Sequence, residues 1–464
     1  MPASRHTVCH PLFGKGLRHT VTRHFYIVSL GCPKSVVDAE GIGQVLRVQG
    51  YERTDRPENA DVLIVNTCGF IAPARDESIA ALRDLAAHKR RGQILIAAGC
   101  LPERKDIALN VLVPRLDGAI GTRHWGEIAA LVEQLRAHRH RRADYVHWRA
   151  IHPEITSLVA PFPRVAAPGA SAYIKIADGC DAPCAFCTIP SIKGPRVSKP
   201  AAQILREAQE LVAQGVKEII LIAQDTTAYG RDLGQQDALP VLIEEILAAV
   251  PGLRWLRVLY SYPQHITSRL VDVMAAHEQV CHYLDMPIQH SHPEVLRRMR
   301  RSPDITGVRR LIATLRQRIP DIALRTTFIV GYPGETEQEF AHLLDFMQEM
   351  TFDKVGVFAY SWEAGTPAAT MPDQVPEQVK EERFHRAMEL QQGISLARNK
   401  AQVGRILPVL IEGQGDGISV GRSYRDAPAI DGMVLIRGTV SPGEMVPARI
   451  VQGLEYDLVG ELTV

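Results

Sequence analysis

KIADGCDAPCAFCTIPSIKG, residues 175–194, contains three cysteines that follow an apolar, strand-like segment. Cys180, Cys184 and Cys187 have the spacing C-x3-C-x2-C. That spacing differs from a C-x-x-C redox pair, and Thr188 stands where a c-type haem site has histidine. A structural zinc site generally has four ligands, often in two separated pairs. Three thiolates in one loop favour a [4Fe–4S] cluster with one iron left open for another ligand.

Short apolar strands and helices alternate around this loop, from residue 172 to about residue 397. Helical segments such as PAAQILREAQELVAQG and TEQEFAHLLDFMQEM separate six predicted strands. The strands are expected near SAYIKIADG, VKEIILIAQD, LRWLRVLY, HYLDMPI, IALRTTFIVGY and FDKVGVFAY. Six βα units are too few for a complete eight-fold barrel. We therefore expect a partial, open-sided (βα)6 barrel.

Residues 25–136 show the same alternation, which predicts a doubly wound parallel sheet in an α/β domain. Cys32, Cys68 and Cys100 each end a predicted strand, in FYIVSLGC, ADVLIVNTCG and QILIAAGC. Ligands of such sheets bind beyond the carboxyl ends of the strands, so we expect these three thiols to lie together. Each cysteine taken alone could equally be a small buried hydrophobe.

The remaining segments have other patterns. Residues 1–24 are expected to form a flexible basic tail, and residues 137–171, basic and then rich in Pro and Ala, to form a linker. Residues 400–464 contain short apolar runs split by Gly, Pro and Asp, which predicts a small antiparallel β-barrel. This barrel has six Lys and Arg against eight Asp and Glu, a net charge of −2, whereas an RNA-binding barrel is expected to be basic.

Bulk composition narrows the class of protein. The chain has 464 residues, a formal net charge of +1 and eight cysteines. The near-neutral charge gives no indication of a strongly cationic nucleic-acid binder. No apolar run is long enough to span a membrane, and the first residues lack the apolar segment of a secretory signal. We therefore expect a cytoplasmic protein, in which clustered thiols indicate metal ligands or catalysts rather than disulfides.

The C-x3-C-x2-C loop after the first strand of a βα domain resembles the radical S-adenosylmethionine (SAM) superfamily. The resemblance implies a [4Fe–4S] cluster on Cys180, Cys184 and Cys187, with SAM bound to its open iron and cleaved to a 5′-deoxyadenosyl radical. Phe186 matches the aromatic position that packs near adenine in that superfamily.

Three further residues are candidates for binding SAM by the same resemblance. Gln224 and Asp225 stand where the superfamily usually carries Gly-Gly-Glu after the second strand, so they are candidates for contacting the SAM ammonium. Gly331, in FIVGYPGETEQEF, lies where the superfamily places a glycine-containing strand beside the adenine. A plain strand-to-helix turn is the alternative interpretation of that stretch.

The chain after its tail resembles the radical SAM methylthiotransferases as a whole, with a C-terminal barrel of the TRAM type. This resemblance implies an auxiliary [4Fe–4S] cluster on Cys32, Cys68 and Cys100 that carries or delivers sulfur, and therefore two clusters in all. SAM then serves both as methyl donor and as radical source. An electron donor such as flavodoxin or ferredoxin is implied as a partner.

Six segments resemble the RimO branch of that family: VSLGCPKSVVDAE, NTCGFI, GCLPER, GCDAPCAFCTIPSIKG, DMPIQH and RSYRDAPAIDG. This branch modifies the β-carbon of an aspartate in the twelfth protein of the small ribosomal subunit. The tRNA-modifying branch typically has Gln-Met-Asn after its first cysteine, where this chain has Pro33, Lys34 and Ser35. Ser35 also departs from the Asn usual in RimO proteins. We expect a ribosomal protein substrate and neither tRNA nor a membrane as partner. The alternatives are a tRNA adenosine methylthiotransferase and a non-catalytic iron–sulfur RNA-binding module.

Isolated residues with metal-binding chemistry remain. Cys9 and Cys281 stand alone and are expected not to be ligands. His282, His290 and His292 lack a cysteine or carboxylate partner at a matching spacing, so we expect no metal there.

Overall fold

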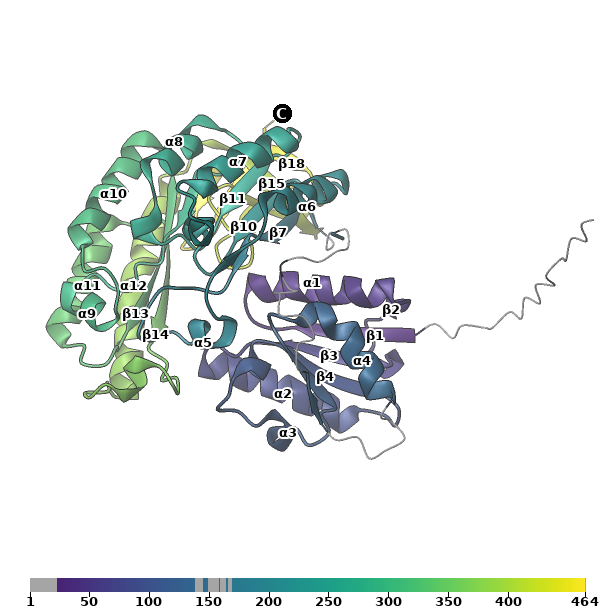
Figure 1. The fold of residues 1–464 in the computed structure, drawn as a ribbon. Coiled ribbons are helices and arrows are strands. Elements are labelled where there is room, and N and C mark those ends of the chain that lie inside the picture. The colour runs from purple at the N-terminus through teal and green to yellow at the C-terminus, as the bar shows by residue number, and fades with distance from the viewer. Residues whose placement is uncertain (1–22, 138–144, 149–157, 159–163, 166–168, 464) are drawn as a thin grey trace, which may run out of the picture.

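The protein is described from a computed structural model over residues 23–137, 145–148, 158, 164–165 and 169–463. The predicted tail, apart from residues 23 and 24, and most of the predicted linker lie outside these residues. In the described part of the chain, no helix is long and apolar enough to cross a membrane. Figure 1 shows the N-terminal sheet and its helices beside the central helices and strands, with the short helix α5 between them and the C-terminal strands behind the central ones.

The N-terminal sheet has six parallel strands in the order β2-β1-β3-β4-β5-β6, which confirms the predicted doubly wound sheet. Val62 and Ile64 of β3 pack on the face covered by α1 and α4, whereas Leu63 and Val65 pack on the face covered by α2 and α3. This alternation follows from the two-residue period of a strand. The strands are β1 (Arg23–Ser29), β2 (Tyr51–Arg53), β3 (Val62–Thr67), β4 (Ile94–Gly99), β5 (Gly118–Gly121) and β6 (Val146–His147). The helices are α1 (Pro33–Val48), α2 (Ala72–His88), α3 (Leu109–Leu112) and α4 (Ile128–Ala137), with 3-10 turns η1 (Pro57–Asn59), η2 (Leu101–Glu103) and η3 (Trp125–Glu127).

Helix α1 begins at Pro33, because the fixed φ of proline suits the first helical position and the missing N–H needs no partner there. Cys32 is therefore the residue that precedes the helix. Helix α2 ends at His88, before Gly92.

The central domain contains the six expected parallel strands, arranged as two three-stranded sheets, β7-β10-β11 and β12-β13-β14. A single parallel bridge between Leu256 and Val280 joins the sheets, so the strands form a partial barrel. Its strands are β7 (Ser171–Lys175), β10 (Glu218–Ile222), β11 (Trp255–Val258), β12 (Tyr283–Asp285), β13 (Ala323–Val330) and β14 (Lys354–Ala359). A hairpin of β8 (Ala177–Asp178) and β9 (Val197–Ser198) flanks the cysteine loop. The helices are α5 (Ile189–Lys193), α6 (Ala201–Ala213), α7 (Ala238–Ala249), α8 (Ser268–Ala276), α9 (Pro293–Arg298), α10 (Ile305–Arg318), α11 (Glu337–Met350) and α12 (Glu377–Lys400), with 3-10 turns η4 (Thr226–Ala228), η5 (Arg231–Leu233), η6 (Pro263–His265) and η7 (Pro367–Thr370).

The C-terminal strands close into a five-stranded barrel in the order β15-β16-β17-β19-β18. The pairs are antiparallel as expected, except that β17 and β19 pair in parallel. The exception arises because β18 returns to pair with β15, which leaves β19 between β17 and β18 and running in the direction of β17. The strands are β15 (Ile406–Gly415), β16 (Ile418–Ser423), β17 (Val434–Arg437), β18 (Met445–Gly453) and β19 (Leu458–Leu462).

Buried charges fix this C-terminal barrel to the central strands. Glu218 on β10 accepts hydrogen bonds from Arg257 of β11 at 2.7 Å and from Arg422 of β16 at 2.6 Å, and all three side chains are buried. Apolar side chains of β10, β11 and β12 share one core with the barrel around these charges. Burial raises the pKa of Glu218, but the Arg422 and Arg257 charges outweigh burial and bring it to about 2.

We predict that Glu218→Gln lowers the free energy of unfolding by about 3 kcal/mol at neutral pH, because it leaves buried Arg257 without a carboxylate and Arg422 with only the exposed Glu412. The pKa of Glu218 lies below its ordinary value of 4.5, so its stabilisation is complete above that pH and is lost as the pH falls toward 2. The variant should therefore lose less stability than the parent chain between pH 5 and pH 2, as denaturant titration would measure.

Glu412→Gln is the matched control, because Glu412 also pairs with Arg422 but is 38% exposed. It should cost less than about 1 kcal/mol. Equal effects of the two variants would contradict a special role for Glu218.

Candidate active site

A cavity of about 480 Å³ lies where the N-terminal sheet meets the central barrel. Its walls come from the carboxyl ends of strands in both domains, the edge at which α/β proteins bind ligands. All six cysteines of the two predicted sets line this cavity: Cys32, Cys68, Cys100, Cys180, Cys184 and Cys187. The structure therefore brings together two cysteine sets that the sequence placed in separate domains.

The N-terminal set follows three adjacent strands. Cys32 follows β1, Cys68 follows β3 and Cys100 follows β4, and these strands are neighbours in the sheet. Glycines allow the three turns to come close to one another. A Cβ on Gly31 would lie 3.0 Å from the Cβ of Cys68, and one on Gly69 would lie 3.0 Å from the backbone of Cys100. Gly31 also has a φ of +95°, which disfavours residues with a side chain.

The second set lies in the loop between β8 and α5, and each sulfur accepts a hydrogen bond. The backbone N–H of Ala182 donates to the Sγ of Cys180, and that of Ile189 donates to the Sγ of Cys187, both at 3.4 Å. Arg301 donates to the Sγ of Cys184 at 3.6 Å. Donors of this kind favour the thiolate, which is the form that binds metal.

The thiols differ in how easily they lose a proton. Burial raises the pKa of Cys100 and of Cys187 to about 12. Burial also raises the pKa of Cys32, but the charge of Lys34 and a backbone hydrogen bond from Ser35 outweigh it and hold the pKa below its ordinary value. Strongly buried thiols of high pKa become thiolates when a metal displaces the proton.

A chain of buried ion pairs holds the two domains together beside the cavity. Lys175 of β7 pairs with Asp38 of α1 at 2.5 Å and with Asp178 at 3.3 Å. Asp178 pairs in turn with Lys193 at 2.8 Å, and Lys193 donates to the hydroxyl of Thr122 in the N-terminal domain. Burial raises the pKa of Asp178, but the two lysines outweigh it and hold the pKa far below its usual range.

A second set of polar contacts crosses the domain boundary beside the cavity. Glu363, which follows β14, accepts from Arg75 at 2.6 Å and from Arg104 at 3.1 Å. Thr188, directly after the central cysteine set, donates to the backbone carbonyl of Phe70. The junction is therefore held by these contacts as well as by the buried ion pairs.

Of the four residues predicted to bind SAM, three line the cavity and one does not. Phe186, Gln224 and Asp225 line the cavity. The Asp225 carboxylate is held by the hydroxyl of Thr227 and by His265, each at 2.7 Å. Gly331 is not among the lining residues. It has a φ of +69°, and a Cβ there would lie 2.3 Å from the side chain of Lys380, so this glycine is required where β13 turns beneath α12.

Several other polar residues line the cavity and were not predicted as site residues from the sequence. They are Lys34, Ser35, Lys193, Tyr260, Tyr262, Gln289, Arg301 and Glu363. Two of them carried a local signal, because Lys34 and Lys193 lie on the short segments that follow cysteines. Ser35 lies beside Lys34 on α1, and Arg301 follows helix α9. The remaining four follow strands whose ends meet only in the folded chain.

The remaining candidates lie elsewhere. Cys281 is buried in the core shared by the central strands and the C-terminal barrel. His282 bonds to Asp321, and His292 precedes α9 and accepts from the backbone of Glu294. In the described residues, no three His, Cys, Asp or Glu side chains converge on a point where they could hold one ion. Cys9 lies outside those residues.

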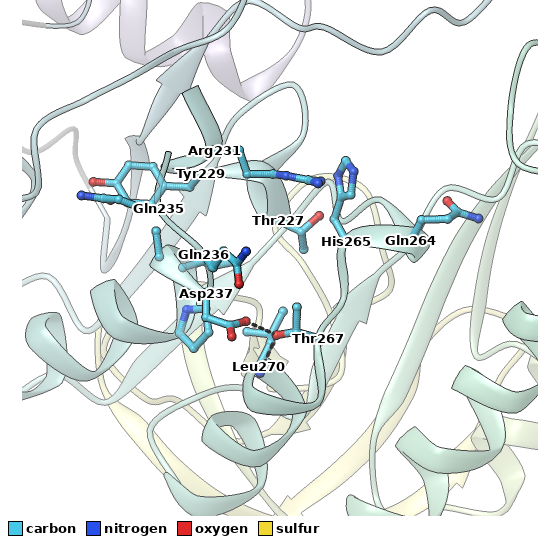
Figure 2. Close-up of a pocket in the computed structure, with 13 residues that line it drawn as sticks. Thr227, Tyr229, Arg231, Gln235, Gln236, Asp237, Gln264, His265, Thr267 and Leu270 are labelled. Atoms are coloured by element: carbon cyan, nitrogen blue, oxygen red, sulfur yellow. Dashed lines mark hydrogen bonds between the residues drawn. The ribbon is translucent and has the colours of Figure 1, made fainter. Parts of the chain in front are cut away.

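A second, smaller cavity of about 240 Å³ contains none of the cysteines. Figure 2 shows polar side chains around it, among them Arg231, Asp237 and His265, with the hydroxyl of Thr267 bonded to Asp237. His265 also contacts Asp225, so the two cavities lie on either side of this pair.

Comparison with protein families divides the chain in the same three parts. Residues 174–347 match the Radical SAM superfamily, residues 403–463 match the TRAM domain, and residues 24–121 match Uncharacterized protein family UPF0004. The fold and the cysteine-lined cavity together define a radical SAM enzyme that uses iron–sulfur chemistry and SAM.

Curated relatives give the particular family. "Ribosomal protein uS12 methylthiotransferase RimO" of Roseiflexus sp. (strain RS-1) is 50% identical over 459 residues, covering 94% of this chain and 97% of the relative. The protein of the same name from Chloroflexus aurantiacus is 48% identical over 461 residues, covering 94% and 99%. The chain therefore belongs to the RimO family of radical SAM methylthiotransferases.

Solved structures show the same fold at much lower sequence identity. The radical SAM methyltransferase TsrM from Kitasatospora setae, solved with cobalamin and a [4Fe–4S] cluster, has a TM-score of 0.57 and 14% identity. The match covers 88% of this chain and 82% of that one. At this identity the likeness concerns the fold alone.

We predict that Asp178→Asn lowers the free energy of unfolding by about 3 kcal/mol or more, because it leaves two buried lysines short of a carboxylate. Hydrogen exchange should quicken in residues 175–194 and in α1, which the ion pairs connect. The control is Asp181→Asn, three residues away, whose half-exposed side chain pairs with Arg196. That change should cost less than about 1 kcal/mol. Equal losses would show that the buried chain of ion pairs is not what joins the domains.

Proposed function

We propose that this chain adds a methylthio group to the β-carbon of an aspartate in the twelfth protein of the small ribosomal subunit. The observation that carries the proposal is that two three-cysteine sets, from two domains, line one cavity. A sulfur-carrying group on one set and a SAM-cleaving group on the other would then reach the same substrate carbon. The names of relatives up to 50% identical support this substrate.

The donor sets fit two [4Fe–4S] clusters, one on Cys180, Cys184 and Cys187 and an auxiliary one on the N-terminal three cysteines. Such a cluster normally takes four thiolates, so three leave one iron open. When bound, the first cluster supplies the electron that cleaves SAM to a radical, and the auxiliary cluster supplies sulfur. The chain itself contributes N–H donors to the central sulfurs and a junction that holds both sets at one cavity.

For SAM we propose a position against Phe186, Gln224 and Asp225. The Asp225 carboxylate is 8% exposed and is oriented from both sides by Thr227 and His265, so it offers a fixed acceptor for an ammonium group. A contact of adenine with the strand that carries Gly331 remains a prediction. Two residues earlier on that strand, Ile329 lines the cavity.

The charge of the C-terminal barrel supports a protein substrate over tRNA. Of its six basic residues, Arg422 and Arg425 are buried in ion pairs with the central domain, where they cannot contact phosphate. Two of its acidic residues, Asp426 and Asp431, are buried in the same interface, so the remaining barrel keeps its acidic excess. An acidic surface complements basic partners, as ribosomal proteins generally are, and repels RNA.

We predict that Cys184→Ala abolishes formation of 5′-deoxyadenosine, because it removes one of three ligands from the SAM-binding cluster. Cys68→Ala should keep this cleavage but give no methylthio product, and each variant should lose about half of the iron. Cys281→Ala, in a buried cysteine away from the cavity, is the control and should keep both activities. If Cys68→Ala and Cys184→Ala lost cleavage equally, the division of labour between the two sets would be wrong.

The substrate is tested by anaerobic incubation of the reconstituted enzyme with SAM, reductant, sulfide and either the ribosomal protein or tRNA. We expect a methylthio mass gain on the protein alone. A gain on tRNA alone would establish the tRNA-modifying alternative. Absence of 5′-deoxyadenosine under all conditions would establish the non-catalytic alternative. The electron donor, a flavodoxin or ferredoxin, and the cytoplasmic location stay predictions.

A further inference from the structure

Lys34 is a buried cation on the wall of the active-site cavity. It lies two residues after Cys32, on the first turn of α1, and is 6% exposed. Its Nζ lies 3.3 Å from the centre of the Tyr260 ring and 3.4 Å from the backbone oxygen of Ala223. The ammonium thus crosses from the N-terminal domain to two loops of the central barrel.

The partners of Lys34 differ from those of the other buried lysines near this junction. Lys175, Lys193 and Lys199 each have a carboxylate within 2.8 Å. Over the residues that the structure describes, Lys34 forms no ion pair, and its one hydrogen bond is long. Burying a cation without a carboxylate in contact is costly, and the acidic group that acts on it most strongly is the Cys32 thiol, which is proposed to bind a cluster. A buried ammonium that faces a cavity under these conditions is suited to an anionic group that enters the cavity.

Tyr260 is held in a strained conformation beneath this ammonium. Its φ is +63°, a region that large side chains rarely adopt, and such strain is concentrated at functional sites. Its backbone N–H donates to Asp285 at 3.0 Å, and Asp285 is fixed by Arg325 at 2.8 Å. The ring face that meets Lys34 is therefore positioned by the central barrel and not by Lys34 itself.

The other cations on the cavity wall are already engaged. Lys193 pairs with Asp178. Arg301 donates to the backbone oxygen of Pro287, stacks on Tyr262 and contacts Cys184, on the side of the cysteine set proposed to bind SAM. Among the described lysines and arginines of this wall, Lys34 and Lys193 both lie near the N-terminal cysteine set, and Lys34 is the one of these two without a carboxylate partner.

We propose that Lys34 binds the side-chain carboxylate of the substrate aspartate and so positions its β-carbon. This rests on the proposed function. The carboxylate carbon is bonded directly to the β-carbon that accepts sulfur, so the carboxylate must lie next to the sulfur source. Lys34 provides a cation at that place, two residues from Cys32. Recognition of the carboxylate also explains how an amide at the same position would be rejected, because asparagine leaves the ammonium unpaired.

The test compares Lys34→Gln with the parent chain, both as anaerobically reconstituted full-length enzyme. The substrates are the ribosomal protein with its target aspartate and the same protein with asparagine there. Loss of a buried charge-assisted contact should raise Kd and KM for the aspartate form by about 30-fold or more. The asparagine form, poor with the parent enzyme, should change by less than about threefold. Binding is measured by fluorescence anisotropy and kinetics by mass spectrometry.

Three further variants give the test its controls. Lys34→Arg keeps the charge and should keep part of the preference for aspartate. Tyr260→Phe keeps the ring face and should retain that preference, whereas Tyr260→Leu should weaken it. Lys105→Gln changes an exposed lysine of the same domain and should match the parent chain.

Equal losses for the aspartate and asparagine forms in Lys34→Gln would overturn the proposal and indicate that Lys34 acts on the N-terminal cysteine set. The proposal would also be overturned if Lys34→Gln changed the iron signal but left the ratio of the KM values for the aspartate and asparagine forms unchanged. Failure of the proposed function gives a separate result. In that case the parent enzyme itself modifies tRNA and not the ribosomal protein.

Discussion

The buried ion pairs that run from Asp38 through Lys175 and Asp178 to Lys193 are the constraint on which the active site depends. The two domains meet at the carboxyl ends of their strands, where these ion pairs cross from α1 to β7 and Lys193 of α5 bonds to Thr122. Buried ion pairs demand exact partners, so they fix one orientation of the domains even where they add little net stability. That orientation turns both cysteine sets toward one cavity.

One end of the central barrel packs against the C-terminal barrel, and the other end carries the candidate active site. At the far end, the C-terminal barrel packs on β10, β11 and β12 and places Arg422 against Glu218, which closes that end with a shared core. At the other end, the strands stop at the cysteine loop, at Gln224, and at the tyrosines after β11. This division is usual for βα barrels, in which one end supports stability and the other carries chemistry.

Helix α1 carries both a residue of the ion pairs between the domains and a residue of the cavity wall. Asp38 and Lys34 are four residues apart, so both lie on the face of α1 that meets the central barrel. Asp38 fixes the helix to β7, and Lys34 extends from its first turn over Tyr260. A change in the seating of α1 would therefore move the Cys32 turn, the ion pairs and the buried ammonium together.

Local sequence patterns were enough to predict the helices, the strands and the two sets of three cysteines. Hydrophobic periodicity and strand-ending glycines are local, so they predicted the N-terminal sheet, the six central strands and the C-terminal barrel, and they put Cys32, Cys68 and Cys100 at strand ends. Local patterns do not report the order of strands or the contacts between domains. Contacts between distant segments bring the two cysteine sets to one cavity, leave Gly331 away from its wall and pair β17 in parallel with β19. They also bury Lys34 without a carboxylate, because its surroundings come from residues about 190 to 225 positions further along the chain.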